Sequence, residues 1–387
     1  MFPTTEVYFV ARNSRLVALA PAVRGHHRHR RVRGRVRHEA SQSSLAGCPI
    51  PTIISASRVR ERAILLGLIG AFVASGTLDD VAASSARSSA DERIVFAREL
   101  PRGSDETFTF TANTDGSGMK RLYRAGPSGS AHWSPDGRSV AVNAACTDGQ
   151  ENCAFTIVDA NTRRFRQVKM RDPGLFTACV VWSPDARRFA CGGYGEPDAT
   201  RNGIYTLRTS DGRGLVRVTR PHGFDEPGDY SPRGTHLVFA RFSKDEKPLG
   251  LFVVRTNGRQ LRRIAPAAPQ LSSGDWSPSG NWILFARRVN AQVHNSLWVV
   301  HPDGSGLREL RLQGVPPCGG QLSTPGTRGC IHPRWSPDGT KITFDIATPR
   351  GAGEVENIYI ANADGSGVTQ VTRGGWEDDA PDWGRRR

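Results

Sequence analysis

The stretch Trp133-Ser134-Pro135-Asp136-Gly137 decides the fold, because close copies of it return along most of the chain. Serine, proline, aspartate and glycine in this order favour a type I turn, in which proline sets φ and glycine accepts a positive φ at the exit. The motif aromatic recurs at positions 133, 182, 230, 276, 335 and 383, in steps of 49, 48, 46, 59 and 48 residues. A period of this length is typical of a four-stranded propeller blade.

Each turn is followed by short apolar runs that alternate as strands do. The runs 236–240 and 251–254 are examples, and the second leads to Asn257-Gly258, a pair that favours a hairpin connection. Each repeat therefore predicts a four-stranded antiparallel sheet. The copies of the motif vary at Ala186, Arg233 and Ser279, which indicates a role in turn formation rather than in chemistry.

The ends of the repeat region complement each other. The strand-like run 94–98 has no motif before it, and the last motif, around Trp383, has no strand after it. We expect 380–384 to supply the innermost strand of the blade that begins at 94, which would join the ring without free sheet edges. The prediction is an all-β, six-bladed propeller over residues 91–387.

These residues resemble the TolB-type propeller family, whose repeats carry W-S-P-D-G and a later D-G-S-G turn. The second element matches at 115–118, 303–306 and 364–367. The resemblance implies binding of proteins or peptides at the propeller mouth, with no catalytic set common to all members. Related repeats occur in prolyl oligopeptidases, but the G-x-S-x-G elbow of a serine hydrolase does not occur in this sequence, so a serine peptidase is not expected.

The first ninety residues differ from the repeats. Residues 1–57 include an Arg/His-rich block at 24–38 without apolar periodicity, so we expect disorder there. Residues 58–86 follow the pattern of an export signal, with a basic start, the apolar run 63–76 and then small residues. Either the natural start lies near Val59, or 1–57 is a cytoplasmic tail on an uncleaved signal anchor. We expect a periplasmic, cell-envelope or extracellular protein.

The charge of the repeat region bears on its partners, and the cysteine content agrees with export. Residues 1–62, 63–90 and 91–387 carry +9, −1 and +7, which together make the net charge of +15. The repeat region therefore mixes charges of both signs, and we expect no nucleic-acid binding. We also expect a monomer.

Beyond Cys48, six cysteines fall in three close pairs, which favours local disulfides over a metal site. The expected pairs are Cys146 with Cys153, Cys179 with Cys191, and Cys318 with Cys330.

Propellers bind ligands over the central channel, near the loops that enter the innermost strands. The equivalent positions here precede each motif aromatic, with Asp229 and Glu377 as neighbours in the same loops. The predicted binding residues are His132, His222, Asp225, Glu226, Asp275, His332, Arg334, Trp376, Asp378 and Asp379. The same side chains also fit a structural role at strand ends around a watery channel.

The one long step points to a further feature. Its excess residues lie at 313–332, and a bridge between Cys318 and Cys330 would pin them as a loop at the mouth beside His332. Inserted loops on one face of a repeat fold often carry binding, although a tolerated surface insertion fits equally.

Two functions remain open. The first is a non-enzymatic, cofactor-free exported scaffold that binds a cell-envelope protein or peptide at its mouth. The second is a secreted hydrolase or lyase for a carbohydrate or lactone-like substrate, with Ca²⁺ or a transition metal in the channel. Only the N-terminal segment, if uncleaved, is expected to meet a membrane.

Overall fold

The computed structural model describes most of the repeat region. The described residues are 92–101, 106–126, 130–143, 153–170, 172, 174–195, 198–288, 295–314, 318, 329–350 and 353–385. All of them belong to one compact unit, and the predicted extension 1–57, the predicted signal 58–86 and Cys146 lie outside them. Among the described residues, we find no helix that has both the length and the apolar character needed to span a membrane.

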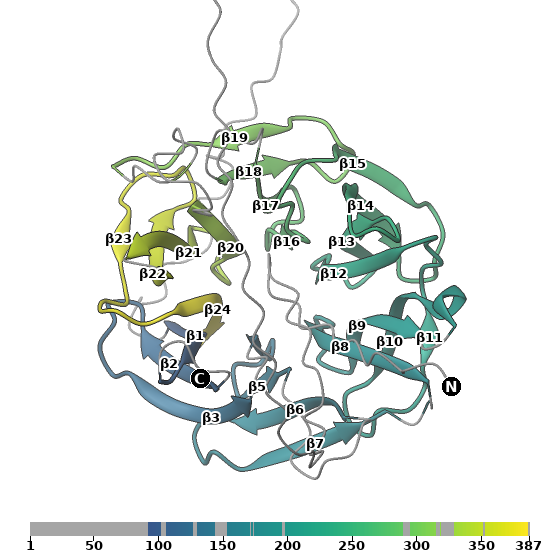
Figure 1. Cartoon of the computed structure of the whole chain (residues 1–387), viewed down its shortest axis with the longest axis horizontal. Helices are drawn as coiled ribbons and strands as arrows, with labels where there is room; N and C mark the ends of the chain where they lie inside the picture. Colours follow the sequence, from purple (N-terminus) through teal and green to yellow (C-terminus); the bar gives the residue numbers. More distant parts are fainter. Residues whose placement is uncertain are drawn as a thin grey trace, which may run out of the picture. The chain divides into compact units, whose positions relative to one another are not determined.

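Six four-stranded antiparallel sheets stand around a central opening as the blades of a propeller (Figure 1). The prediction of an all-β six-bladed propeller is confirmed. Blade 1 contains β24 (Asp378–Arg385), β1 (Glu92–Glu99), β2 (Thr107–Asn113) and β3 (Lys120–Gly126). Blade 2 contains β4 (Ala131–Trp133), β5 (Ser139–Val142), β6 (Cys153–Asp159) and β7 (Phe165–Lys169).

The other four blades follow in chain order, each with its innermost strand first. Blade 3 contains β8 (Leu175–Trp182), β9 (Arg188–Gly195), β10 (Gly203–Arg208) and β11 (Val216–Arg217), with the short 3-10 helix η3 (Ala199–Arg201) before β10. Blade 4 contains β12 (Phe224–Tyr230), β13 (His236–Phe242), β14 (Pro248–Arg255) and β15 (Arg262–Pro266). Blade 5 contains β16 (Asp275–Trp276), β17 (Ile283–Arg287), β18 (Ser296–Val300) and β19 (Arg308–Leu310). Blade 6 contains β20 (Gly329–Trp335), β21 (Lys341–Arg350), β22 (Gly353–Asn362) and β23 (Thr369–Gln370).

The two ends of the repeat region share blade 1, as the sequence predicts. β24 pairs antiparallel with β1, with Ile94 opposite Trp383 and Arg98 opposite Asp378. The interlock leaves β1 paired on both sides, because β2 covers its other edge. This pairing closes the ring through main-chain hydrogen bonds rather than through side chains alone.

The motif turn folds as its residue types require. In the first copy, Gly137 N donates to Ser134 O at 2.8 Å, and the Ser134 hydroxyl donates to Asp136 Oδ1 at 2.6 Å. Gly137 has a φ of 68°, and Ala186 adopts a φ of 58° at the same place in the next copy. The left-handed conformation is thus required by the turn even where glycine is absent.

The core lies between neighbouring blades. The second strands of blades 1, 4, 5 and 6 carry Phe96, Phe239, Phe285 and Phe344, all fully buried. Burial of each such side chain stabilises the folded state by about 1.5–3 kcal/mol. The wedge between blades 6 and 1 includes Ile358 together with Trp383, so the closing strand is also part of the core.

Candidate functional site

One arginine spans the central channel. Arg334 precedes the motif aromatic of blade 6, and its Nη1 donates to Asp275 Oδ1 of blade 5 at 3.0 Å and to Gly228 O of blade 4 at 3.3 Å. Its Nη2 lies 3.5 Å from His132 Nε2 of blade 2. A single guanidinium therefore joins four blades at the axis, because its fork of donors reaches in several directions.

Three aspartates, each directly before a motif aromatic, connect their own blade to the next one around the ring. Asp382 Oδ2 accepts from Trp133 N at 2.7 Å, which joins blade 1 to blade 2. Two bonds of the same kind follow around the ring. Asp229 Oδ2 accepts from Trp276 N at 3.1 Å, and Asp275 Oδ2 accepts from Trp335 N at 2.7 Å.

We define the channel cluster as His132, Asp229, Asp275, Arg334 and Asp382. The pKa values of these side chains are shifted from their usual values. Burial raises the pKa of Asp382 to about 7, against the attraction of Arg334. Burial and the neighbouring Asp275 raise the pKa of Asp229 well above its usual value. Burial and the charge of Arg334 lower the pKa of His132. Asp382 therefore exchanges a proton near neutrality, and burial together with Arg334 disfavours a charge on His132.

The guanidinium determines what this cluster can hold. Burial opposes the charge of Arg334, but Asp275, Asp382 and Asp229 outweigh that effect and raise its pKa. The carboxylates thus face a resident cation. Among the described residues, no group of three or more His, Cys, Asp or Glu side chains is placed to hold a metal ion. The channel metal of the alternative function remains a prediction without a donor set in this part of the chain.

A second set of charges lies at the mouth, the end of the channel where the innermost strands begin. Arg98 and Arg241 follow a Phe-Ala pair in the second strands of blades 1 and 4. Arg98 Nη2 donates to Asp378 Oδ2 at 2.7 Å, and Arg241 Nε donates to Asp225 Oδ1 at 2.7 Å. Both carboxylates are essentially buried, so each arginine is neutralised inside its own blade.

Blade 5 repeats the arginine without the carboxylate. Arg287 follows the same Phe-Ala pair, and its side chain stacks on Trp298 with the guanidinium carbon 3.9 Å from the ring centre. Ser272 N donates to Ala286 O and Arg288 N donates to Pro269 O, both at 2.9 Å, so Leu271 and Gln270 lie opposite Arg287. Leu271 stands five residues before the motif aromatic Trp276, the spacing that Asp225 and Asp378 have in blades 4 and 1. Leu271 therefore occupies the position that Asp225 and Asp378 hold in blades 4 and 1.

The consequence is a buried cation with incomplete hydrogen bonding. Arg287 is 8% exposed, and its Nε has no hydrogen-bond partner in the structure of the described region. Burial lowers the pKa of Arg287, while the charge of Glu309 opposes the change. Glu309 attracts Arg287 without forming a hydrogen bond to it among the described residues. Blade 5 is thus the place at the mouth where a carboxylate is missing.

The mouth side of blade 6 carries a histidine in a strained position. His332 lies in a β-bulge of β20 with a φ of 47°, and its Nδ1 is 2.9 Å from Oδ1 of the fully buried Asp345. Bulges re-aim side chains at the rims of barrels and next to sites. Burial raises the pKa of Glu226, and the charge of His332 acts in the opposite direction, so these side chains interact electrostatically.

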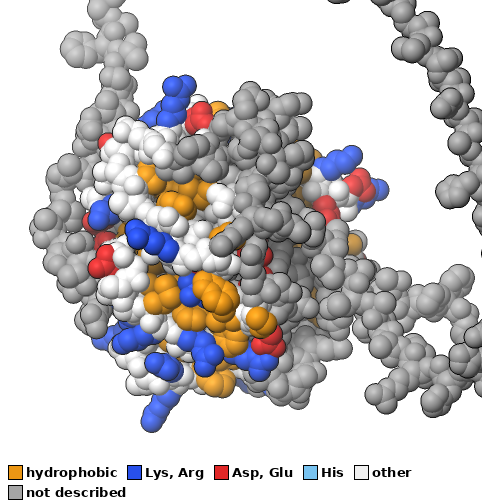
Figure 2. Space-filling model, turned by 60° about the vertical axis from the view of Figure 1, so that its left-hand side comes forward, with side chains coloured by type: hydrophobic (Ala, Val, Ile, Leu, Met, Phe, Trp, Pro, Cys, Tyr) orange, Lys and Arg blue, Asp and Glu red, His pale blue; other side chains and the backbone are white. Residues whose placement is uncertain are grey.

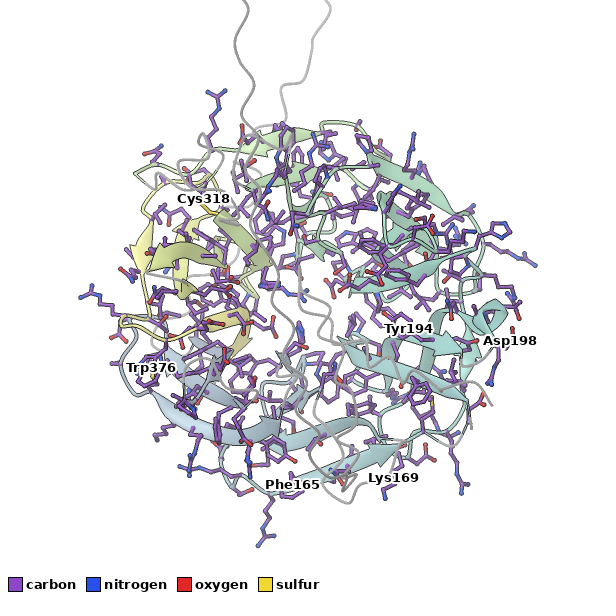
Figure 3. The ribbon with its side chains drawn as sticks, viewed as in Figure 1. Phe165, Lys169, Tyr194, Asp198, Cys318 and Trp376 are labelled. Atoms are coloured by element: carbon purple, nitrogen blue, oxygen red, sulfur yellow. A yellow bond between two sulfur atoms is a disulfide. The ribbon has the colours of Figure 1, made fainter. Side chains whose placement is uncertain are left out.

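A partly buried tyrosine, Tyr194, lies on the channel side of blade 3 (Figure 3). Burial, followed by the charges of Glu226 and Asp225, raises the pKa of Tyr194. Tyr194 is therefore an uncharged hydroxyl beside the two carboxylates of β12.

The disulfide prediction is confirmed for the mouth pair. Cys318 and Cys330 form a disulfide with their Cα atoms 5.2 Å apart, and Cys330 is the second residue of β20, the innermost strand of blade 6. Cys191 is also disulfide-bonded, and the backbone register places it opposite Cys179. The pairing of Cys146 with Cys153 lies outside the described residues.

The structure brings some predicted binding residues together and separates others. His132, Asp275 and Arg334 meet in the channel cluster, with Glu226 and His332 close enough to act on it or on each other. Two predicted residues, Asp225 and Asp378, form ion pairs with arginines of their own blades. Their part in binding remains a prediction.

The other predicted residues lie apart from the cluster. His222 is exposed in the loop before β12, and Asp379 lies in β24 opposite Ala97. Trp376 is partly exposed, with the Arg98 guanidinium carbon 5.9 Å from the centre of its ring system (Figure 3).

Sequence reasoning missed Asp382 and Arg287 as site residues. Asp382 was visible from its place directly before the motif aromatic, the place that Asp275 and Arg334 also hold. Arg287 was visible as the third copy of Phe-Ala-Arg, but its missing partner depends on a register that only the structure shows.

Comparisons with known proteins support the fold. No known family model and no curated protein sequence matches the chain. Its structure is similar to that of TolB from Acinetobacter baumannii, with a TM-score of 0.57, 18% identity and coverage of 77% of this chain and 67% of that one. A putative TolB from Agrobacterium tumefaciens gives a TM-score of 0.52, 17% identity and coverage of 76% and 91%. A chain of the nidogen/laminin complex gives a TM-score of 0.53 at 10% identity, with coverage of 76% of this chain and 99% of that one. The chain thus has the TolB-type six-bladed β-propeller fold.

Proposed function

We propose that this chain is an exported scaffold that binds a protein or peptide at the propeller mouth, where an acidic side chain of the partner pairs with Arg287. The observation that carries the proposal is the register of blade 5, which places Leu271 where blades 1 and 4 place a carboxylate. A buried guanidinium without its counter-charge is unfavourable, and a carboxylate supplied by a partner would restore the pair.

The surroundings of Arg287 favour this use. Asn295, which begins the next part of blade 5 after β17, bridges to Gly329 at the start of β20, and Cys330 N donates to Asn295 O at 3.4 Å. The Cys318–Cys330 disulfide holds that start of β20 in place. The unpaired cation therefore lies beside a covalently fixed element of the mouth, which limits the entropy lost when a partner binds.

Export and the absence of catalysis are parts of the same proposal. The Cys318–Cys330 disulfide supports an oxidising compartment, because such bonds persist mainly outside the cytosol. A propeller of this fold also occurs in a complex of nidogen with laminin, which supports protein binding as a use of the architecture. The proposal also includes that the chain is a monomer and binds no nucleic acid.

Selection of peptides against the full-length chain tests the proposal. A random peptide library is passed over immobilised wild type, Arg287→Gln and Arg255→Gln, the last removing an exposed arginine at the end of β14 away from the mouth. We expect wild type and Arg255→Gln to enrich the same acid-containing peptides. Their affinity should fall about tenfold or more in Arg287→Gln, and equally when the peptide acid is changed to its amide.

Two outcomes overturn the proposal. One is that wild type enriches no peptide. The other is that the enriched peptides bind Arg287→Gln as tightly as wild type, which would place their binding site elsewhere. Arg287→Lys separates charge from shape, because lysine keeps the charge and loses the planar fork.

A further inference from the structure

The wedge between blades 3 and 4 differs from the other wedges of the ring. Five of the six motif aromatics are tryptophan, and the one at the start of blade 4's turn is Tyr230. Where the smaller ring stands, the face of the motif turns is hollowed by an open pocket of about 580 Å³. The strands that flank it belong to neighbouring blades in Figure 1.

The pocket is built from both motif turns and from the sheet edge between them. The lining residues include Pro184 and Asp185 from the turn of blade 3, Pro232 and Arg233 from the turn of blade 4, and Arg188, Thr206 and Val216 from the strands of blade 3. Two prolines and a half-exposed valine give it apolar walls, and the remaining side chains are polar. A pocket of this size is in the range that holds small organic ligands.

Its unused polar groups are donors. Tyr230 is 5% exposed, and its Oη has no hydrogen-bond partner within the described part of the chain. Arg233 is exposed and forms no hydrogen bond or ion pair with the described residues. Arg188 donates through Nε and Nη2 to Thr206 and through Nη2 to Gly214 O, and these bonds hold its guanidinium at the wall.

The acceptors of the pocket are already engaged. Asp185 Oδ1 accepts from the Ser183 hydroxyl at 2.6 Å and from Arg187 N at 3.1 Å within its own turn. Those hydrogen bonds lower the pKa of Asp185, so its charge is stabilised by its turn rather than by the pocket arginines. Two guanidinium groups against one carboxylate leave the pocket with a net positive charge.

We propose that this pocket is a second binding site, on the motif-turn side of the ring, for a small ligand that carries a carboxylate. Arg233 supplies free planar donors that match a carboxylate, and Arg188, whose Nε and Nη2 are already bonded, adds a second positive charge. The Tyr230 hydroxyl, buried in the pocket wall without a partner among the described residues, is a further donor. Pro184, Pro232 and Val216 contact the carbon chain of the ligand. The site is independent of the mouth and of Arg287.

The test uses the full-length chain and glutarate as the probe, with glutaramide as the uncharged match, in a calorimetric titration. We expect glutarate to bind and glutaramide to bind at least about tenfold more weakly, since a hydrogen bond to a charged group is worth more than one to a neutral group. Acetyl-glutamate amide, titrated in parallel, distinguishes a free organic acid from an acidic side chain of a peptide as the source of the carboxylate.

Four variants locate the binding. Arg233→Gln is expected to weaken glutarate about tenfold, and Tyr230→Phe about threefold to fivefold while it keeps the pocket open. Tyr230→Trp gives blade 4 the residue of the other five copies, so the fold should be retained, while the larger ring narrows the pocket and the phenolic hydroxyl is lost, so glutarate should bind more weakly. Arg255→Gln removes an exposed positive charge outside the lining residues and should leave binding unchanged.

The proposal is overturned if wild type does not bind glutarate, or if Tyr230→Trp binds it as wild type does. It is equally overturned if Arg255→Gln weakens binding as much as Arg233→Gln, which would indicate attraction to overall charge. None of these results depends on the peptide selection at the mouth.

Discussion

Arg287 lies opposite Leu271 in blade 5, in the register at which Arg241 meets Asp225 in blade 4. The three Phe-Ala-Arg segments therefore form an internal comparison within one molecule. Two of the arginines have an ion pair in their own blade, and the third stacks on Trp298 with its Nε unbonded.

The first prediction follows from this difference. Arg98→Met leaves Asp378 buried without a counter-charge and should lower the free energy of unfolding by about 3–5 kcal/mol. Arg287→Met removes a buried guanidinium that has no carboxylate to lose, so its effect should stay within about 1 kcal/mol or be stabilising. Urea unfolding followed by tryptophan fluorescence measures both. Equal losses in the two variants would show that Arg287 has a partner of its own.

The second prediction concerns pH. The folded chain holds a proton on Asp382 up to a pH of about 7, whereas an unfolded aspartate releases it near 3.8. A raised folded-state pKa means that the folded state binds more protons between these values, so stability falls as the pH rises through them. One such group contributes a slope of at most about 1.4 kcal/mol per pH unit.

Asp382→Asn should remove this part of the slope. The amide oxygen can still accept from Trp133 N, so the link between blades 1 and 2 is kept. We expect the variant to gain stability relative to wild type at pH 8 compared with pH 5, as measured by urea unfolding at both values. A constant difference between the two proteins would mean that Asp382 ionises normally.

The third prediction concerns the motif turn of blade 3. Ala186 holds a φ of 58°, where Gly137 holds 68° in blade 2. A left-handed conformation costs an L-residue about 1–2 kcal/mol relative to glycine, so Ala186→Gly should raise the thermal midpoint. Gly137→Ala is the matched reverse change and should lower it by a similar amount. Scanning calorimetry compares the two, and a decrease in both variants would contradict the prediction.

The fourth prediction concerns closure. Deletion of 378–387 leaves β1 with an open edge and removes Asp382 from the channel cluster. We expect the shortened chain to lose cooperative unfolding, and a synthetic 376–387 peptide to restore it when added in excess. The same peptide with Trp383→Ala should restore less, because Trp383 packs in the core between blades 6 and 1. Cooperative unfolding of the shortened chain without the peptide would contradict the role of β24.

The fold was predictable because its signals are local and repeated. A turn of fixed residue types recurs with nearly constant spacing, and the unmatched segments at 94–98 and 380–384 indicate the interlock. The site was less predictable because its geometry depends on contacts across the ring. Arg334 meets Asp275 and His132 from blades far apart in sequence, and no local pattern pairs them.

Which charged side chains pair with one another could not be predicted from the sequence either. Asp225 and Asp378 were expected to face a ligand, but strand register gives each an arginine from its own blade. Arg287 has no carboxylate because Leu271 stands five residues before Trp276, whereas Asp225 and Asp378 stand five residues before the motif aromatics of blades 4 and 1.

The interlock also affects the order in which the molecule can fold. Residues 92–99 are synthesised well before β24, the strand that pairs with their inner edge. Asp378, the ion-pair partner of Arg98, follows it by 280 residues in the sequence. Until then β1 has an unpaired edge and a buried-type arginine without its carboxylate. Pairings of such long sequence separation slow folding and leave edges open to aggregation. The nascent chain would therefore need protection, by a chaperone or by delayed folding, until residues 378–385 arrive.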